Sequence, residues 1–508
     1  MADEIEIKLQ VPPLVLRTVA QLPWLRPMAA GPARRAKLVS VYFDTPRHKL
    51  RANGVVLRVR HLGSKRVQTV KTAGNGAFTR GEWESEIKGD RPDLGAAADT
   101  PLARLVNAKL KRKLRPVFET SVLRTAIPIR AGNSELELAL DRGEIKTGRR
   151  REPVSEIEIE LKSGDPAEIS RLAERIAKAV SARYEPRSKP ERGYALSAGT
   201  AGTAVHAEPI ALDRSMTTGE AFRAIGFSCL HQLCANEQGV RGADSESVHQ
   251  MRVGLRRLRA AMSVFKELLD DSEAAAVKAE LKWLTEQLGP ARDLDVFVRE
   301  SVAPLSDTAS EIGVLQEDME QKRDAGFLRA REAVDSERYR RLVLQTALWL
   351  ANGSWFTTTD PLRSIRRARP AAAFAAEVLT IRLDKIVKKL KKLKKLDPLR
   401  RHKLRIAIKK LRYAGEFFAG LFDGGRSRRK RLADVLEELQ EALGKLNDFG
   451  MHKKLAGEIV HRGKHKDRRS EKAFAMGIVT GREQDEFEAC MATAMKAGGR
   501  ISARQFWR

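Results

Sequence analysis

The chain has 508 residues, which is too long for a single hydrophobic core and predicts two or three domains. Its 95 lysines and arginines against 66 aspartates and glutamates give a net charge of +29, which favours an anionic partner such as nucleic acid, an acidic membrane surface or a phosphate compound. Three cysteines without a CxxC pair argue against a disulfide framework and a thiolate zinc site. Without an apolar leader or a run of about 18 apolar residues, we expect a cytoplasmic protein with no transmembrane segment.

Charged and apolar residues alternate at the start of the chain. In a strand, Glu4, Glu6 and Lys8 share one face, while Ile5 and Ile7 share the other. Such a charged face suits a strand exposed to solvent, and it equally suits a strand that lines a cavity holding a metal ion and an anion. This segment alone leaves both interpretations open.

The same alternation recurs further along the chain. Strands are predicted at 37–43, 55–60, 67–71, 80–86, 121–129, 136–140 and 155–162, with helical segments near 101–111 and 165–182. Their charged faces carry Arg58, Arg60, Lys71 and Arg124 on basic strands, and Glu82, Glu84, Glu156, Glu158 and Glu160 on acidic ones. Because burying so many charges of one sign is prohibitive, the two kinds of strand should face each other across the lumen of an antiparallel barrel. A phosphate chain with a divalent ion would satisfy both halves.

Two further charged residues have an open interpretation. Arg80 and Asp141 lie near the predicted charged face, and each fits a functional role as well as a structural ion pair or turn.

Several motifs in residues 1–197 carry a family resemblance. They are the ExExK pattern of Glu4, Glu6 and Lys8, and the segments YFDTP (42–46), LRVR (57–60), TVK (69–71), EIEIELK (156–162) and SKPERGY (188–194). Together they resemble the CYTH family, also called triphosphate tunnel metalloenzymes. The resemblance implies an eight-stranded antiparallel tunnel with flanking helices, which binds triphosphates with divalent metal.

The resemblance also implies roles for individual residues. Mg2+ or Mn2+ would be held by Glu4, Glu6, Glu158 and Glu160. The phosphate chain would be bound by Lys8, Arg58, Arg60, Lys71, Arg124 and Lys189, of which the first four are also the expected catalytic residues. Glu82, Glu84 and Glu156 would extend the acidic wall. The implied reaction is metal-assisted attack of water on the terminal phosphoryl group, without a covalent nucleophile.

A small, flexible linker at 198–215 precedes an expected all-helical domain at 216–500, which contains an internal repeat. Residues 248–259 match residues 401–412, and an LGxxxD element follows each copy, at 288–293 and 443–448. A duplicated helical unit is the direct explanation, with one copy at about 216–300 and the other at about 370–460. Between the copies, 311–349 is predicted to form two helices, and the basic runs 426–431 and 462–469 are predicted to be loops.

Each copy of the repeat places basic residues on one face of a helix. The two sets are His249, Arg252, Arg256 and Arg259, and His402, Arg405, Lys409 and Arg412. A charge run is commonly a solvated face, but solubility does not require the same residue types at the same offsets, which favours anion binding. The two histidines could also be metal ligands. The surrounding cations argue against that alternative.

This repeat resembles the CHAD domain, which often follows CYTH. The resemblance implies two pseudo-symmetric helical bundles with a basic groove between them that binds inorganic polyphosphate. The whole chain is then an α+β multidomain protein.

The two resemblances together predict a metal-dependent triphosphatase that acts on inorganic triphosphate and whose helical domain binds polyphosphate. Alternatives on the same tunnel are a thiamine triphosphatase, a nucleoside triphosphatase and an adenylate cyclase. A different class is a non-catalytic polyphosphate-binding protein, but such a protein gains nothing from carboxylates that face its anion. Nucleic acid ranks last among the partners, because aromatic residues for base stacking make up only 6% of the chain.

Overall fold

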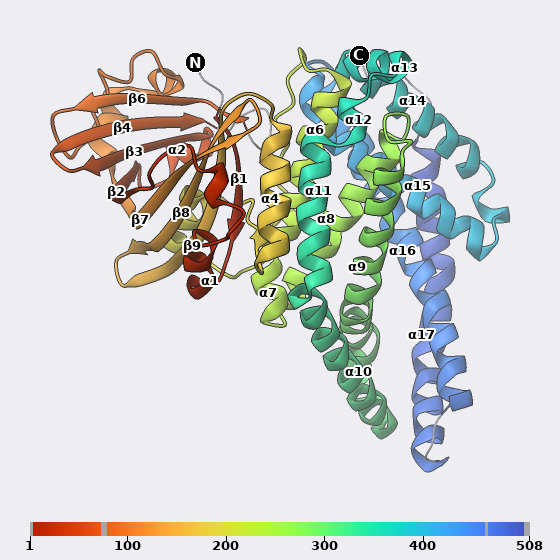
Figure 1. The fold of residues 1–508 in the computed structure, drawn as a ribbon. Coiled ribbons are helices and arrows are strands. Elements are labelled where there is room, and N and C mark those ends of the chain that lie inside the picture. The colour runs from red at the N-terminus through yellow and green to blue at the C-terminus, as the bar shows by residue number, and fades with distance from the viewer. Residues whose placement is uncertain (1–3, 73–78, 463–465, 502–508) are drawn as a thin grey trace. The chain divides into compact units, whose positions relative to one another are not determined.

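The computed structural model describes residues 4–72, 79–462 and 466–501. These residues form two compact units (Figure 1). The first unit comprises residues 1–204 with the short segments 234–238 and 335–357, and the second comprises residues 205–233, 239–334 and 358–508. The predicted boundaries at 197 and 216 stay predictions.

The first unit is built on one antiparallel sheet. Its strands are β1 (Glu4–Gln10), β2 (Arg34–Asp44), β3 (Val55–Leu62), β4 (Lys65–Thr72), β5 (Thr79–Arg80), β6 (Glu82–Ile87), β7 (Arg115–Ala131), β8 (Ser134–Thr147), β9 (Arg150–Ser163) and β10 (Arg183–Tyr184). They follow the order β10-β1-β9-β8-β7-β2-β3-β4-β6, and β5 pairs with β1. Among the described strands, β5 and β10 have two residues each, and the other strands make up the predicted eight-stranded sheet.

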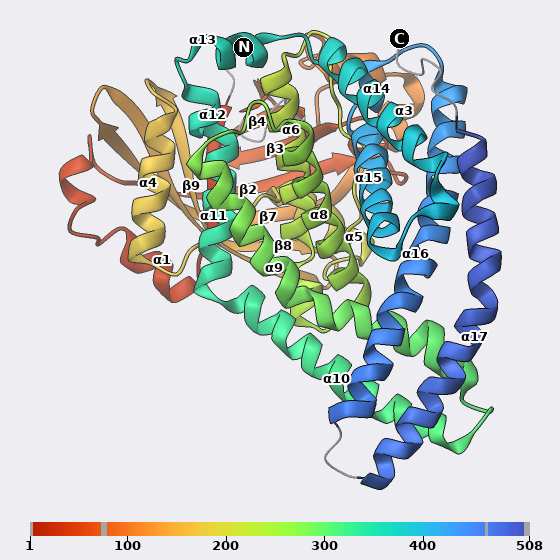
Figure 2. The same ribbon diagram turned by 90° about the vertical axis from the view of Figure 1, so that its right-hand side faces the viewer.

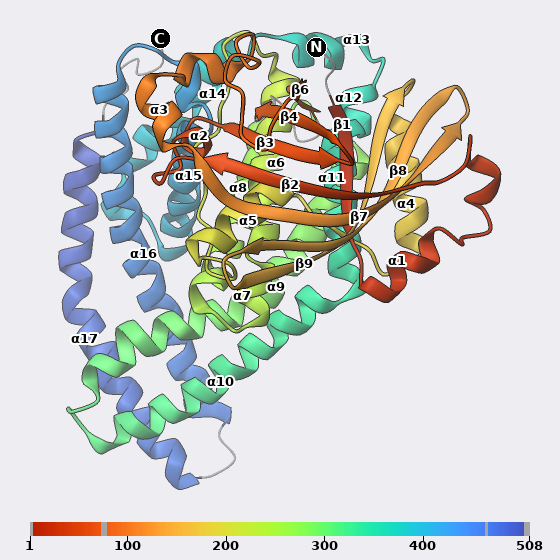
Figure 3. The ribbon, with the colours of Figure 1, turned by 90° about the vertical axis from the view of Figure 1, so that its left-hand side faces the viewer.

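Figure 3 shows the strands of this sheet, which closes on itself through one short segment. β6 pairs with β4 at one end of the strand order, and β5, which Gly81 alone separates from β6, pairs with β1 near the other end. A Cβ at position 81 would lie 2.6 Å from the Trp83 ring, so only glycine fits this junction. The closed sheet surrounds a central cavity.

Both faces of the strands are shielded from solvent, which explains the period of two in the sequence. On β1, Ile7 and Leu9 are buried in the hydrophobic core, while Lys8 between them is 8% exposed on the opposite face. On β3, Leu57 and Val59 are fully buried and Arg58 is 8% exposed. The charged face therefore lines the lumen and does not face bulk solvent, which decides between the two interpretations of the N-terminal strand.

Helices cover the sheet of the first unit. The described ones are α1 (Pro13–Val19), η1 (Arg26–Met28), α2 (Lys49–Ala52), η2 (Pro101–Leu105), α3 (Ala108–Lys113), α4 (Ala167–Ala179), α5 (Lys189–Ala198), α11 (Glu337–Asn352) and α12 (Ser354–Thr357). α4 packs on β1 and β9, and α11 packs on α4 and β10. α5 contacts β7, β8 and β9, and so brings its first residue, Lys189, to the lumen.

The second unit is helical (Figure 2). Its described helices are α6 (Thr218–Ala235), α7 (Glu237–Arg241), α8 (Ser245–Val264), α9 (Ser272–Phe297), η3 (Val298–Val302), η4 (Ala303–Leu305), α10 (Ser310–Asp335), α13 (Pro361–Ala368), α14 (Ala371–Leu390), η5 (Leu393–Lys395), α15 (Pro398–Phe417), η6 (Ala419–Leu421), α16 (Arg426–Arg462) and α17 (Lys466–Gly499); a few terminal residues of α6, α7 and α10 belong to the first unit.

The duplication is visible in the order of the long helices. α6, α8, α9 and α10 correspond to α14, α15, α16 and α17, and the matching helices α8 and α15 contact each other. The first helices of the two sets also meet, since the backbone N–H of Thr218 donates to Arg369 and that of Ala371 donates to Met216. The two predicted helices at 311–349 are confirmed as α10 and α11.

One prediction for this unit is wrong. The basic run 426–431 is not a loop but forms the first turns of α16. Arginine and lysine are good helix formers, and Gly424 and Gly425 place the break in the chain just before them. The run 462–469 contains residues outside the described ranges, and from Lys466 onward it is also helical. Among the described residues, none of the helices has the length and hydropathy that a membrane span requires.

Candidate functional site

The closed sheet contains a cavity of about 600 Å3. Twelve of the charged residues singled out in the sequence line it: Glu6, Lys8, Arg58, Arg60, Lys71, Glu82, Glu84, Arg124, Asp141, Glu158, Glu160 and Lys189. Ser40, Tyr42, Glu137 and Lys162 line it as well; no role was predicted for them, although two of the quoted motifs contain Tyr42 and Lys162. The backbones of Glu4 and Arg80 pair with each other, and their side chains lie outside the described part of the chain.

Strand register places acidic and basic residues of β1 and β9 side by side. Glu6 lies opposite Glu160, and Lys8 lies opposite Glu158. The ammonium of Lys8 is 2.5 Å from Glu6 Oε1, and the ammonium of Lys162 is 2.6 Å from Glu160 Oε1. Each carboxylate of the Glu6 and Glu160 pair therefore has a cation of its own, which offsets the repulsion between the two neighbouring carboxylates.

Strands β3, β4 and β6 form a more basic wall. Arg58 contacts Glu82 at 3.1 Å and Glu84 at 3.6 Å, and Lys71 contacts Glu82 at 2.9 Å. Burial together with the positive charge of Arg58 lowers the pKa of Arg60 to about 10. This wall holds more positive charge than its carboxylates neutralise, so an anion in the lumen would be stabilised there.

Lys189 is the centre of the best-connected ionic cluster of the lumen. Its ammonium is 2.7 Å from Asp141 Oδ2 and 2.8 Å from Glu158 Oε1, and it also contacts Glu156. Burial lowers the pKa of Lys189, but the three carboxylates outweigh burial and hold that pKa well above its usual range. Arg124 binds Asp141 at 2.6 Å and also contacts Glu158. Both cations are therefore fixed and protonated.

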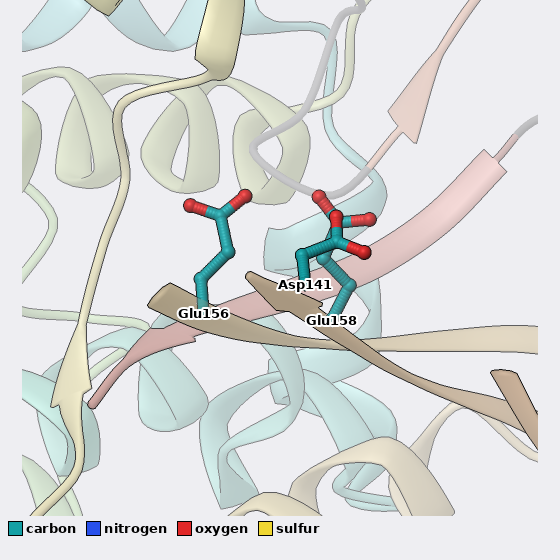
Figure 4. A group of neighbouring side chains, drawn as sticks. All are labelled: Asp141, Glu156 and Glu158. Atoms are coloured by element: carbon teal, nitrogen blue, oxygen red, sulfur yellow. The ribbon is translucent and has the colours of Figure 1, made fainter. Parts of the chain in front are cut away.

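The carboxylates of this cluster come from two neighbouring strands. Figure 4 shows Asp141 of β8 with Glu156 and Glu158 of β9, all on the same side of the strands. Burial raises the pKa of Glu158, but Lys189 and Arg124 outweigh it and hold the pKa well below its usual range. For Glu156, burial prevails and raises the pKa.

Glu156 is not among the residues that line the lumen. Its carboxylate accepts from Arg192 at 3.1 Å, and Arg192 also binds Glu152 at 2.7 Å. The sequence did not point to Arg192, although the SKPERGY motif contains it. The signal was available: Ser188 and Glu191 form a capping box, which starts α5 and puts Lys189 and Arg192 one turn apart on the same helix face.

The first unit also holds carboxylate oxygens of the kind that bind divalent ions, although the ammonium of Lys189 now contacts all three carboxylates of its cluster. Oxygen atoms of Asp141, Glu156 and Glu158 lie within 4.8 Å of one another, and no other group of this kind occurs among the residues that the structure describes. Carboxylate oxygens, here also those of Glu6 and Glu160, are the ligands that Mg2+ and Mn2+ take in proteins. The assignment of particular ligands stays a prediction.

The contacts of Lys189 lead to a prediction about the stability of the first unit. Lys189→Met would leave three buried carboxylates with only Lys8, Arg124 and Arg192 beside them, so we expect the free energy of unfolding of the first unit to fall by about 3–5 kcal/mol. Lys146→Met is the matched control, because Lys146 pairs with Glu119 at 2.7 Å but is 36% exposed, and its loss should cost less than about 1 kcal/mol. Urea unfolding of the full chain measures both. Equal destabilisation would contradict a central role for Lys189.

The second unit brings the two predicted basic stripes together. α8 carries His249, Arg252, Arg256 and Arg259, and α15 carries His402, Arg405, Lys409 and Arg412. Where the two helices meet, burial and the charges of Arg405 and Arg256 lower the pKa of Lys409 to about 7. We call this set of eight residues the basic groove.

Residues of the LGxxxD elements contact residues of the basic groove. Arg252 contacts Asp293 at 2.9 Å, and His402 bonds to Asn447, the residue before Asp448. A Cβ at Gly289 would lie 3.3 Å from Arg252 Nη1, so the glycine lets the guanidinium lie close to the helix. Burial, Arg292 and Arg256 lower the pKa of His249 to about 4. Arg292 was not singled out in the sequence.

Several donors of the groove are buried without a hydrogen-bond partner among the described residues. They are Nε of Arg252, Arg256, Arg405 and Arg412, and Nη1 of Arg252. The last residue of each stripe has a partner outside the groove. Arg412 contacts Glu437 at 2.8 Å, and Arg259 donates to Thr285. Buried unpaired guanidinium donors are costly unless an anion satisfies them.

The first unit is thus a tunnel, formed by a closed antiparallel sheet around a charged lumen, and a duplicated basic helical unit follows it in the chain. The CYTH domain model matches residues 2–194, and the CHAD domain model matches residues 224–456. The chain belongs to the proteins that carry a CYTH domain followed by a CHAD domain.

The sequence identity to individual proteins is modest. An inorganic triphosphatase of Haemophilus influenzae is 29% identical over 201 residues, which cover 39% of this chain and 55% of that protein. An uncharacterised protein of Mycobacterium tuberculosis is 29% identical over 338 residues, which cover 60% of this chain and 62% of that protein. The chain thus spans less than two thirds of either relative. The crystal structure of the CHAD domain from the plant Ricinus communis is 28% identical, has a TM-score of 0.51 and covers 59% of this chain and 98% of that one.

Proposed function

We propose that the tunnel hydrolyses a triphosphate, with inorganic triphosphate as the substrate, and that the basic groove binds inorganic polyphosphate. The observation that carries the first proposal is the lumen, which holds guanidinium and ammonium groups together with a set of carboxylates. A site that only bound polyanions would be weakened by those carboxylates, whereas a hydrolase can use them to hold a divalent ion. The similarity to an inorganic triphosphatase supports this choice of substrate.

The cations of the lumen would bind the phosphate chain. Arg58, Lys8 and Lys71 each contact a carboxylate now, and each can exchange it for a phosphate oxygen. Arg60 has no carboxylate contact among the described ion pairs and donates to Ser40 at 3.2 Å, so its charge is available to the substrate. The cavity volume of about 600 Å3 is ample for three linked phosphoryl groups.

The carboxylates would hold the divalent ion. Glu6, Glu158 and Glu160 line the cavity, and Glu4 lies two residues before Glu6 on β1. When bound, Mg2+ or Mn2+ supplies Lewis-acid stabilisation of negative charge on the phosphoryl oxygens. Lys189 and Arg124 add fixed positive charge at the neighbouring cluster, and because their own carboxylate contacts hold them in place, they need no reorganisation as charge develops.

Phosphate release by the full chain tests the tunnel proposal. The substrates are inorganic triphosphate, thiamine triphosphate, ATP and long-chain polyphosphate, each with Mg2+, with Mn2+ and with EDTA. We expect metal-dependent release that is fastest with triphosphate and is abolished by EDTA. Faster release from thiamine triphosphate or ATP would make that compound the substrate. Formation of cyclic AMP from ATP would make the tunnel an adenylate cyclase. No release from any substrate, with polyphosphate still bound, would favour a non-catalytic binding protein.

A further inference from the structure

The second unit carries a lysine-rich surface that the proposed function does not use. The end of α14 and the short turn η5 that follows it contain seven lysines within eleven residues. All seven are exposed, and none belongs to the basic groove. We call this set the lysine patch: Lys385, Lys388, Lys389, Lys391, Lys392, Lys394 and Lys395.

The lysine patch belongs to a packed part of the unit. Leu383, Ile386 and Leu393 alternate with the lysines and are buried. α14 contacts α15 and α17, and η5 also contacts α17 (Figure 2). The apolar face of this segment is therefore fixed in the core, and the ammonium groups are presented together on the opposite, exposed face.

The charges of the patch are not neutralised within the second unit. Among the residues that the structure describes, none of the seven lysines forms an ion pair or a side-chain hydrogen bond. Of the two aspartates that flank the patch, Asp384 is half-buried, and Asp397 pairs with Arg400 at 3.2 Å. Neighbouring like charges repel one another, so an anionic partner would stabilise this surface.

The residue types of the patch favour an extended anionic surface over a single phosphate chain. Five of the eight residues of the basic groove are arginines, whose planar guanidinium groups bind phosphate oxygens in pairs, and several of their donors are buried. The patch contains only lysines, which are hydrated point charges on flexible side chains. Such a cluster attracts a surface with many negative charges without selecting one arrangement of phosphates.

Exposed apolar side chains border the patch. Leu399, in the first turn of α15, is 63% exposed, and Ile381, four residues before Lys385 on α14, is 44% exposed. Such groups gain nothing from a hydrated phosphate chain, but they can enter the boundary between the headgroups and the acyl chains of a bilayer. Residues 381–403 include no aromatic residue for base stacking, which argues against nucleic acid.

We propose that the lysine patch, together with Leu399, binds the protein to the surface of a lipid bilayer with anionic headgroups. The lysines supply the attraction to the headgroups, and Leu399 enters the interface between headgroups and acyl chains. No residue of the patch has been assigned to the tunnel or to the basic groove. The inference therefore does not depend on the proposed function.

Vesicle binding by the full chain tests the proposal. The protein is mixed with vesicles of phosphatidylcholine and phosphatidylglycerol in equal parts, or of phosphatidylcholine alone, and bound protein is measured by co-sedimentation. We expect binding to the anionic vesicles only, and weaker binding as salt is added. Equal binding to both kinds of vesicle would overturn the proposal.

Two variants that lose the same charge separate the patch from the net charge of the chain. The test variant combines Lys388→Gln, Lys389→Gln, Lys391→Gln and Lys392→Gln. The control combines Lys109→Gln, Lys111→Gln, Arg112→Gln and Lys113→Gln, all exposed on α3 of the first unit. Glutamine is a good helix former, so both should fold, which circular dichroism checks. The test variant should bind anionic vesicles at least about 10²-fold more weakly, and the control less than about threefold. Equal losses would overturn the proposal.

A change that leaves the charge intact tests the choice of a bilayer. Leu399→Gln should weaken vesicle binding by about 3–10-fold, whereas Leu362→Gln, at a leucine of α13 that is 66% exposed outside the patch, should not. Unchanged binding of Leu399→Gln would overturn the bilayer as the partner. The four-lysine variant should also keep its affinity for polyphosphate within about threefold. Loss of polyphosphate binding with unchanged vesicle binding would instead make the patch part of the polyphosphate site.

Discussion

Replacing Glu6 and Glu160 together by glutamine is expected to lower kcat for triphosphate hydrolysis by at least about 10³-fold, with little increase in KM. The two residues lie opposite each other on β1 and β9, and both line the lumen. Glutamine keeps their shape but removes the charge that a divalent ion requires. The cations Lys8 and Lys162, released from these carboxylates, would still attract the phosphate chain. Steady-state kinetics at saturating Mg2+ measures the effect.

Glu119→Gln is the matched control for this variant. Glu119 lies on β7 and pairs with Lys146, but it does not line the cavity. Its kinetics should stay within about twofold of the wild type. A double variant that keeps its kcat would exclude Glu6 and Glu160 as metal ligands, and a rise in KM alone would make them substrate-binding residues.

The tunnel could be predicted from the sequence because its signal is local. A strand with a charged residue at every second position has one charged face, and several such strands require a shared lumen. The structure places Lys8, Arg58 and Glu158 on that lumen, with Ile7, Leu57 and Ile157 in the core. The alternation therefore determines which residues line the site.

Contacts between residues on different sides of the lumen could not be predicted from the sequence. Lys189 lies 48 residues after Asp141, and no local pattern predicts that its ammonium lies between Asp141 and Glu158. Glu156 continues the alternation of Glu158, yet it does not line the cavity, and its carboxylate pairs with Lys189 and Arg192 of α5.

In the helical unit, the duplicated stripes were predictable because both copies repeat the same residue types. The bond between His452 and Glu483 was not, because the two residues are 31 positions apart on different helices. The loop predicted at 426–431 is wrong for a simpler reason. Charge density was given more weight than helix propensity, although arginine and lysine extend a helix readily.

Polyphosphate binding depends most strongly, we expect, on the two arginines at the meeting point of α8 and α15. Arg256→Met with Arg405→Met should weaken binding of long-chain polyphosphate by about 10²–10³-fold, because both guanidinium groups carry buried donors without a partner. Arg214→Met with Arg500→Met removes the same charge from exposed positions outside the groove. Isothermal titration at a fixed salt concentration compares the two. Similar losses would mean that net charge, and not the groove, binds polyphosphate.

The pH profile of the same titration separates a specific groove from a general positive field. Lys409 lies beside Arg256, Arg405 and Arg412, with Asp448 as the facing carboxylate, and its pKa in the free protein is about 7. A bound phosphate raises that pKa, so above pH 7 binding must take up a proton, while well below pH 7 Lys409 is already charged. The association constant should therefore fall by up to about tenfold per pH unit above pH 7 and level off below it. Lys409→Met should flatten this profile, which also separates Lys409 from any contribution of His402. An unchanged slope in Lys409→Met would place the bound phosphates away from the point where the two repeats meet.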